Sequence, residues 1–432
     1  MKIFLIGSGG REHAIADKIV NSPEFIRTNS TLYSTAGNLG IDSISKLIKI
    51  SPENISELLQ FALKEKIDLT IVGPEIPLSL GICDEFRKNN LRIFGPDKKA
   101  AEIETSKIFA KGLMSEYHIP TADFRSFEKS DMNDIKNFVN KIGYPVVIKA
   151  DGLAAGKGVI FAENFNEVEE TINDLTINKI FGGSGTSFII EKFITGKEIS
   201  LFIITDGKDY ILLPSSQDHK RVNDNDEGKN TGGMGAFSPA DNIFTDEVRI
   251  KAEERIIKPT LKALRSEGRN FIGCLYAGLI IDSKNDPYVI EFNCRFGDPE
   301  TQCVLQLIDG DIIPVLYSTA NSDLKQYKDS GILKLKKGYS VCVVLASGGY
   351  PDTFEKNKVI SGLDRIDKDI KIFYSGVKNE NADILTNGGR VLSLVSYSDL
   401  SLNDAISKVY SNIEKVGFDK VHYRKDIGSK GL

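Results

Sequence analysis

Short apolar runs alternate with helix-like patterns over the first 104 residues. Apolar runs cover residues 3–6, 69–72 and 92–94, and helical patterns cover 12–20 and 55–64. This alternation is typical of a parallel sheet whose strands are connected by helices. The apolar runs end at glycine-containing turns, and ligands of open α/β sheets bind beyond the carboxyl ends of the strands. We therefore predict a Rossmann-like α/β domain over residues 1–104 that contacts a substrate.

The next pattern indicates a small α+β unit over residues 105–190. A helical pattern begins at Lys107, and two strand-like runs at 145–149 and 159–162 flank a glycine-rich segment. Because glycines allow backbone conformations that other residues avoid, we expect this segment to be a loop.

Residues 191–325 and 326–432 complete the predicted organisation. The first range has strand patterns at its start and near its end, separated by a polar, glycine-bearing segment typical of an active-site loop. The second has strand patterns at 340–346, 372–374 and 390–395, and a helix near 402–414. A chain of 432 residues is too long for one core at about 100–200 residues per domain, so we predict a multi-domain α/β protein.

Composition narrows the possible partners and location. The chain is 41% hydrophobic and 27% charged with a net charge of −5, so it has no basic field for nucleic acid. Residues 1–7 lack the apolar region of a signal peptide, and no apolar run reaches the roughly 20 residues of a membrane-spanning helix. Five scattered cysteines without a C-x-x-C pair indicate reduced thiols. We predict a cytoplasmic protein without membrane or nucleic-acid partners.

The histidines indicate what kind of metal the chain can bind. All four are dispersed, and no two have the i, i+4 spacing that places two imidazoles on one metal. Any bound metal should therefore be a hard cation with oxygen ligands.

The segment 147–159 has the composition of a phosphate-binding loop. It contains a lysine at a strand end, three glycines and a second lysine: Lys149, Gly152, Gly156, Lys157 and Gly158. Glycines let backbone N–H groups approach phosphate oxygens, and lysines neutralise the remaining charge. The segment is not a P-loop, because that motif's first glycine and metal-binding hydroxyl are missing. The structural alternative is a β-hairpin with solvated lysines.

The strand pattern at 288–293 carries a candidate magnesium site. Period-two alternation places Val289, Glu291 and Asn293 on one face, and Ile290 and Phe292 on the other. Mg²⁺ prefers carboxylate and neutral oxygen ligands when it also binds phosphates. Alternatively, Glu291 is an exposed carboxylate paired with a lysine.

Three polar or charged segments lie before and after this pattern in the sequence. Residues 295–301 carry Arg295, Asp298 and Glu300 around a glycine and a proline, and structural turns rarely need all three charges. Residues 216–221 and 230–235 offer cations, amides and flexible backbone for a developing phosphate charge. The alternative for residues 216–221 and 230–235 is a solvated surface loop.

The first glycine-rich turn, Gly7-Ser8-Gly9-Gly10, follows a strand and opens a helix. Glu12 stands where the dinucleotide fingerprint needs a small residue, and its carboxylate would oppose a pyrophosphate. We therefore predict that a single phosphate or a sugar phosphate binds here.

Together these motifs resemble the phosphoribosylamine–glycine ligase family of the ATP-grasp superfamily. The resemblance is carried by GSGGREHA, GPEIPL, KADGLAAGKGV, SQDHKR, NTGGMG, EFNCRFGDPE and YRKDIG. It implies an ATP-grasp core of two halves, a small C-terminal domain, and a monomer that joins glycine to 5-phosphoribosylamine through glycyl phosphate. That reaction is the second step of de novo purine synthesis.

The resemblance also implies roles for particular residues. ATP would be bound by Lys107, Lys149, Gly152, Gly156, Lys157, Gly158, Glu191, Phe193 and Glu198, with residues 152–158 closing over it. Mg²⁺ or Mn²⁺ would bind Glu291 and Asn293. Arg295, Arg221 and Asn230 would stabilise the transferring group. The other substrates would contact Gly9, Gly10, Asp218, Arg295, Asp298 and Glu300.

Three alternatives remain open at this point. A different ATP-grasp ligase or carboxylase would share the nucleotide chemistry, although no biotin-attachment segment is visible. An inactive nucleotide-binding regulator would not need Glu291, Asn293 and both loop lysines. A nicotinamide dehydrogenase is disfavoured by Glu12.

Overall fold

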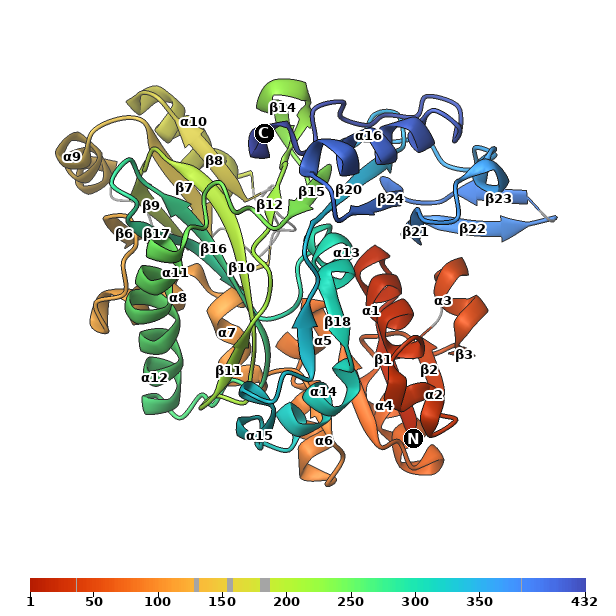
Figure 1. Ribbon diagram of the computed structural model, residues 1–432. Coiled ribbons are helices and arrows are strands. Elements are labelled where there is room, and N and C mark those ends of the chain that lie inside the picture. The colour runs from red at the N-terminus through yellow and green to blue at the C-terminus, as the bar shows by residue number, and fades with distance from the viewer. Residues whose placement is uncertain (36, 128–131, 154–157, 179–186, 382) are drawn as a thin grey trace.

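The architecture follows from a computed structural model (Figure 1). The structure describes residues 1–35, 37–127, 132–153, 158–178, 187–381 and 383–432. Within these ranges, no helix is long and apolar enough to cross a membrane.

The N-terminal sheet is parallel throughout, as predicted. Its strands are β3 (Lys46–Ile48), β2 (Thr31–Thr35), β1 (Lys2–Ile6), β4 (Leu69–Val72) and β5 (Ile93–Phe94), in that spatial order. Connecting helices include α1 (Gly10–Val20), α4 (Ile55–Glu65), α6 (Ile82–Lys88) and α7 (Lys98–Thr105). Strand β4 is buried along its whole length, as expected for a strand that helices cover on both faces. The turn after β1 leads directly into α1, so the glycine turn lies at a carboxyl edge of the sheet.

A small four-stranded sheet follows in the chain. Its order is β6 (Phe124–Phe127), β9 (Phe188–Lys192), β7 (Val146–Ala150) and β8 (Val159–Ala162). Helices α9 (Met132–Ile142) and α10 (Phe165–Thr176) pack on it and form a hydrophobic core separate from the two larger ones. Helix α8 (Lys107–Glu116) precedes this sheet and contacts β9.

An antiparallel sheet lies beside the small one (Figure 1). Its order is β11 (Tyr210–Leu212), β10 (Lys197–Thr205), β16 (Gly273–Ile281) and β17 (Pro287–Asn293). All nine residues of β16 are buried, because other strands and helices cover this central strand. Helices α8 and α11 (Asp246–Ala252) contact β17, and α14 (Ile312–Ala320) contacts β10 and β16.

The third large sheet combines the polar segment 217–238 with the C-terminal part of the chain. Its order is β12 (Gln217–Asp218), β15 (Gly235–Ser238), β20 (Tyr339–Ala346), β24 (Arg390–Ser398) and β21 (Lys371–Tyr374), and α16 (Leu402–Ile413) packs on β20 and β24. Between β12 and β15, the hairpin of β13 (Arg221–Asn223) and β14 (Glu227–Asn230) projects from this sheet. The segment predicted as a loop is therefore largely short strands.

The short helix α13 (Glu300–Val304) joins these parts. It contacts α1 of the N-terminal unit and the strands β15, β20 and β24. In Figure 1 it lies at the centre of the molecule, between α1 and the C-terminal sheet. The charged segment before α13 therefore lies where the N-terminal, central and C-terminal parts of the chain meet.

Candidate active site

Two buried lysines pair with Glu191 on β9. Its carboxylate forms ion pairs with the ammonium groups of Lys111 and Lys149, and all three side chains are at most 5% exposed. Lys149 also donates a 2.9 Å hydrogen bond to the carbonyl of Ile290 on β17. Burial acts to raise the pKa of Glu191, but the two lysines outweigh it and lower the pKa. Glu191 is therefore an ionised counter-charge that fixes Lys149 toward β17.

The glycine-rich segment joins the antiparallel strands β7 and β8, so it is carried by a hairpin. Its lysine at the strand end, Lys149, is buried instead of solvated, which contradicts the structural alternative for that side chain. Lys107, the first residue of α8, donates a 2.9 Å hydrogen bond to the carbonyl of Gly152. Gly158 directly precedes β8, and Gly156 and Lys157 lie outside the described residues.

Strand β17 contains a bulge that the period-two prediction lacks. Gly278 on β16 lies opposite Glu291, whereas the next residue, Leu279, lies opposite Val289. Ile290 is therefore an extra residue without a cross-strand partner. Its carbonyl is the acceptor for Lys149, so the bulge supplies a contact between the two sheets.

The bulge changes which side chains share a face. Val289 and Phe292 are both buried, whereas Glu291 and Asn293 are both partly exposed. The prediction that Val289 lies on the face of Glu291 is wrong, because the extra residue reverses the alternation. Glu291 and Asn293 follow the bulge and stay on one face.

Glu291 shares a lysine with Glu198 of β10. The Nζ of Lys220 lies 3.6 Å from Glu198 Oε2 and 3.8 Å from Glu291 Oε1. Burial acts to raise the pKa of Glu291, but Lys220, Lys149 and Lys107 together lower it. Glu291 is therefore ionised at neutral pH.

Glu291 and Asn293 suit a hard divalent cation. A carboxylate and an amide oxygen are ligands that Mg²⁺ accepts while it keeps phosphate oxygens and waters. In the described part of the chain, no group of three or more His, Cys, Asp or Glu side chains could hold a metal alone. The donors therefore fit a cation that protein and nucleotide bind jointly.

Arg295 lies beyond the end of β17 and connects it to the N-terminal unit. Its guanidinium pairs with Glu104 Oε1 at 3.0 Å and with Glu75 Oε2 at 3.3 Å. The other oxygen of Glu104 accepts a 2.7 Å hydrogen bond from the amide of Cys294. Burial acts to lower the pKa of Arg295, but the two carboxylates raise it, so the guanidinium stays charged. Glu104 thus fixes both the side chain and the adjacent backbone.

Asp218 and Glu300 form a second acidic pair. Burial, followed by the charge of Glu300, raises the pKa of Asp218 well above its usual range. Glu300 accepts a 3.0 Å hydrogen bond from Ser200, whose hydroxyl lies 3.1 Å from that of Tyr276. Asp218 and Glu300 are therefore close enough for the charge of Glu300 to affect the titration of Asp218.

Asp298 connects the C-terminal sheet to this region. Its carboxylate pairs with Arg390 at 3.1 Å and accepts a 2.7 Å hydrogen bond from Gln302. Burial acts to raise the pKa of Asp298, whereas Arg390 and Arg11 lower it. Arg390 also donates to the carbonyl of Gly232, so residues from three parts of the chain converge here.

The N-terminal glycine turn lies beside Asp298. A Cβ atom added to Gly9 would lie 3.8 Å from Asp298 Oδ2. Glu12 accepts a 2.6 Å hydrogen bond from the amide of Gly9 and pairs with Arg11, so its carboxylate caps the turn. The start of α1, at Gly10, is thus brought to the segment 295–301, as a shared substrate site requires.

Arg221 and Asn230 are cross-strand partners in the β13–β14 hairpin. The Arg221 guanidinium donates a 2.7 Å hydrogen bond to the carbonyl of Gly228 and lies 5.5 Å from the ring centre of Phe161. Phe161 in turn contacts Phe193, with ring centres 5.9 Å apart. The hairpin is therefore linked to the small sheet and to Phe193, which is one of the residues predicted to bind ATP.

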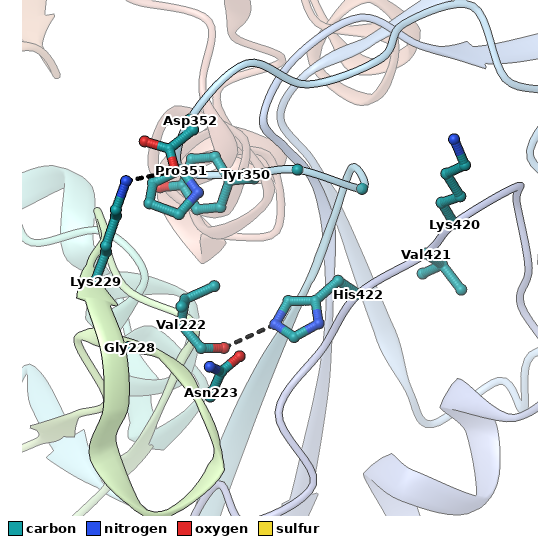
Figure 2. Close-up of a pocket in the computed structure, with 12 residues that line it drawn as sticks. Val222, Asn223, Gly228, Lys229, Tyr350, Pro351, Asp352, Lys420, Val421 and His422 are labelled. Carbon is teal, nitrogen blue, oxygen red and sulfur yellow. Dashed lines mark hydrogen bonds and ion pairs between the residues drawn. The ribbon is translucent and has the colours of Figure 1, made fainter.

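A cavity of about 530 Å³ lies on the other side of this hairpin, against the C-terminal part of the chain. Figure 2 shows Lys229 paired with Asp352 across it, and the ring of His422 directed at the carbonyl of Val222. None of its described lining residues is a predicted site residue.

Five residues at the site were not predicted: Glu75, Glu104, Lys111, Lys220 and Arg390. Glu75 and Lys220 lie within recognisable motifs, GPEIPL and SQDHKR, so a signal existed for them. The other three meet the site only because distant elements pack together, and no local pattern marks them.

Family models match nearly the whole chain. They are the N domain of phosphoribosylglycinamide synthetase over residues 1–104, its ATP-grasp (A) domain over 105–301, and its C domain over 340–430. A phosphoribosylamine–glycine ligase of Fusobacterium nucleatum is 44% identical over 432 residues, covering 99% of this chain and 98% of that protein. One from Neisseria meningitidis serogroup B is also 44% identical, covering 100% of each.

Solved structures agree with these matches. A crystal structure of phosphoribosylamine–glycine ligase from Thermotoga maritima has a TM-score of 0.81 and 32% identity, and the match covers 99% of this chain and 100% of that one. A biotin carboxylase domain from Hydrogenobacter thermophilus, in complex with MgADP, has a TM-score of 0.73 at 18% identity, covering 97% and 91%; this match supports the fold alone. The chain therefore belongs to the phosphoribosylamine–glycine ligase family, ATP-grasp ligases of the second step of purine biosynthesis.

Proposed function

We propose that this chain joins glycine to 5-phosphoribosylamine at the expense of ATP. A carboxylate oxygen of glycine attacks the γ-phosphorus and ADP leaves. The amine then attacks the carbonyl carbon of glycyl phosphate, phosphate leaves, and the amine nitrogen loses a proton. The observation that carries this proposal is that one face of β17 presents Glu291 and Asn293 between Lys149 and Arg295.

ATP lies between the small sheet and the antiparallel sheet in this proposal. The residues that bind it are Lys107, Lys149, Gly152, Gly156, Lys157, Gly158, Glu191, Phe193 and Glu198. Support comes from the two lysine contacts, to Gly152 and to Ile290, which place two ammonium groups near the loop and the bulge. In this proposal Glu191 acts through its side chain, which holds Lys149 in an ion pair.

Mg²⁺ or Mn²⁺ is bound by Glu291 and Asn293 together with the nucleotide. When bound, the cation neutralises phosphate charge and so favours attack on phosphorus. The charge on the transferring group is further stabilised by Arg295, Arg221 and Asn230. No protein nucleophile is needed, because positioning and charge stabilisation account for catalysis of this kind.

The remaining substrates bind around the segment 295–301. We assign phosphoribosylamine to the space between the Gly9-Gly10 turn and Asp298, and the glycine site to Asp218, Arg295 and Glu300. A helix start suits the sugar phosphate, because backbone N–H groups at a helix N-terminus point toward an anionic ligand. A carboxylate pair suits the ammonium group of glycine, because oxygen acceptors of negative charge bind N–H donors strongly.

We also propose the division into units 1–104, 105–190, 191–325 and 326–432, a monomeric state and a cytoplasmic location. Strand β15, from the unit 191–325, pairs with β20, from the unit 326–432, so the last two units share a sheet.

The proposal is tested by ADP formation with ATP, Mg²⁺ and freshly prepared phosphoribosylamine, with and without glycine. Wild-type protein should form ADP only when glycine and the amine are both present, and Glu291→Ala should abolish it. Glu169→Ala, on an exposed part of α10, is the matched control and should retain activity. Equal ADP formation without glycine, or formation only with bicarbonate, would contradict the substrate assignment.

A further inference from the structure

Lys220 lies between two carboxylates that the sheet itself holds apart. Glu198 is on β10 and Glu291 is on β17, and β16 runs between these strands. Neighbouring strands are about 4.8 Å apart, so the two backbones are separated by roughly twice that distance. The Lys220 ammonium lies 3.6 Å from one carboxylate and 3.8 Å from the other. The single positive charge of Lys220 is thus shared by the carboxylates of Glu198 and Glu291.

Gly278 lies on β16, the strand between the two that carry Glu198 and Glu291. It lies directly opposite Glu291 and also opposite Ser200, two residues beyond Glu198 on β10. A Cβ atom added to Gly278 would lie 3.2 Å from Glu291 Cγ. The absence of a side chain at Gly278 therefore leaves space between the two carboxylates, and Lys220 reaches into that space.

The ammonium of Lys220 is held loosely, whereas its backbone is held firmly. Both the amide and the hydroxyl of Thr231 donate 2.8 Å hydrogen bonds to the Lys220 carbonyl. At the other end, the two Nζ–oxygen distances exceed the 2.7–2.9 Å typical of direct charge-assisted hydrogen bonds. Among the described residues, Lys220 forms ion pairs only with Glu198 and Glu291. The side chain is 35% exposed, and the hydrogen bonds that hold the Lys220 backbone do not involve it.

Lys220 remains charged in this position. Two carboxylates within 4 Å of its ammonium group favour the charged form of the side chain. A positive charge 3.8 Å from a Glu291 oxygen repels any cation that approaches the same carboxylate.

We infer that Lys220 is a stand-in cation that excludes divalent metal from Glu291 until nucleotide binds. This inference rests on the proposed role of Glu291 in metal binding. Without nucleotide, Glu198 and Glu291 offer two negative charges, and Lys220 already neutralises one. A nucleoside triphosphate brings about four more negative charges, enough to hold both the metal and the ammonium. The metal therefore enters with the nucleotide and not before it.

The test is Mn²⁺ titration of the full-length, nucleotide-free protein, with free Mn²⁺ measured by electron paramagnetic resonance. Lys220→Met should bind Mn²⁺ at least tenfold more tightly than wild type. Lys220→Arg keeps the charge and should bind like wild type. Lys229→Met is the matched control, because this exposed lysine on the same hairpin pairs with Asp352, and it too should bind like wild type.

Two results would overturn the inference. One is wild-type Mn²⁺ affinity in Lys220→Met with an unchanged circular dichroism spectrum; if that variant does not fold, Lys220→Gln replaces it under the same criterion. The other is persistence of the gain in Lys220→Met/Glu291→Ala, since the metal would then bind elsewhere. Failure of the ligase proposal is distinguishable, because it appears as wild-type ADP formation that does not depend on glycine.

Discussion

Glu104 Oε1 lies 3.0 Å from the guanidinium of Arg295, and Glu104 Oε2 accepts a hydrogen bond from the amide beside that arginine. A carboxylate of α7 thereby orients an arginine at the end of β17, 191 residues later in the chain. Glu75 also pairs with Arg295 but at 3.3 Å and with greater exposure, so it is the partner more easily exchanged for a substrate anion.

Glu104→Gln should lower kcat by about tenfold, because a neutral amide orients Arg295 less strongly than a carboxylate does. The KM for ATP should change less than kcat. Steady-state ADP formation measures both. Glu102→Gln, on the same helix but pairing with Arg269 away from the site, should behave like wild type. Equal effects of the two substitutions would refute the orienting role of Glu104.

Glu191→Gln should destabilise the protein markedly. The substitution leaves the buried ammonium groups of Lys111 and Lys149 without a counter-charge, and removing one partner of a buried pair costs about 3–5 kcal/mol. Thermal unfolding should show the loss. Adding Lys111→Met should recover part of it, since one uncompensated charge is then removed. A double variant that is less stable than the Glu191→Gln variant would contradict the role of Glu191 as the counter-charge of the two lysines.

Stability should fall on mild acidification because of His13. Burial lowers the pKa of this histidine from 6.5 to about 4, and its Nδ1 accepts a hydrogen bond from the amide of Tyr374. Between these two pH values the unfolded chain binds a proton that the folded protein does not, so the free energy of unfolding decreases as pH falls. The loss from this group between pH 7 and 5 is about 2 kcal/mol.

Urea unfolding at pH 7 and pH 5 measures this effect. His13→Gln should be less stable at pH 7 but should lose less stability between the two pH values than wild type does. The exposed His118 supplies the control, and His118→Gln should keep the wild-type pH dependence. An unchanged pH dependence in His13→Gln would assign the loss to other groups.

Asp298→Ala should raise the KM for phosphoribosylamine about tenfold or more, with little change in the KM for ATP. The reason is that Asp298 lies beside the Gly9 turn and holds Arg390 and Gln302 at the proposed sugar-phosphate site. Asp352→Ala, an exposed carboxylate on the C-terminal part of the chain, is the control. If the KM for ATP rose more than the KM for phosphoribosylamine, Asp298 would instead belong to the nucleotide site.

Local patterns predicted much of the fold. The parallel N-terminal sheet and strands such as β7, β8 and β20 follow from apolar runs of strand length, and the structure has them within one or two residues. The strands β2, β3 and β16 were not predicted. For β16, which is buried throughout, a continuous apolar run carries no period that identifies a strand.

The sequence by itself determined which groups we propose to carry the chemistry, because Lys149, Glu291, Asn293 and Arg295 stand in motifs whose residue types suit phosphate and a hard cation. Only the tertiary structure decided how these groups are held. The bulge at Ile290, the counter-charge of Glu191 and the position of Lys220 between two strands depend on contacts between segments far apart in the chain. Local periodicity reports the neighbours along one element, whereas such charge pairs are set by which elements pack together.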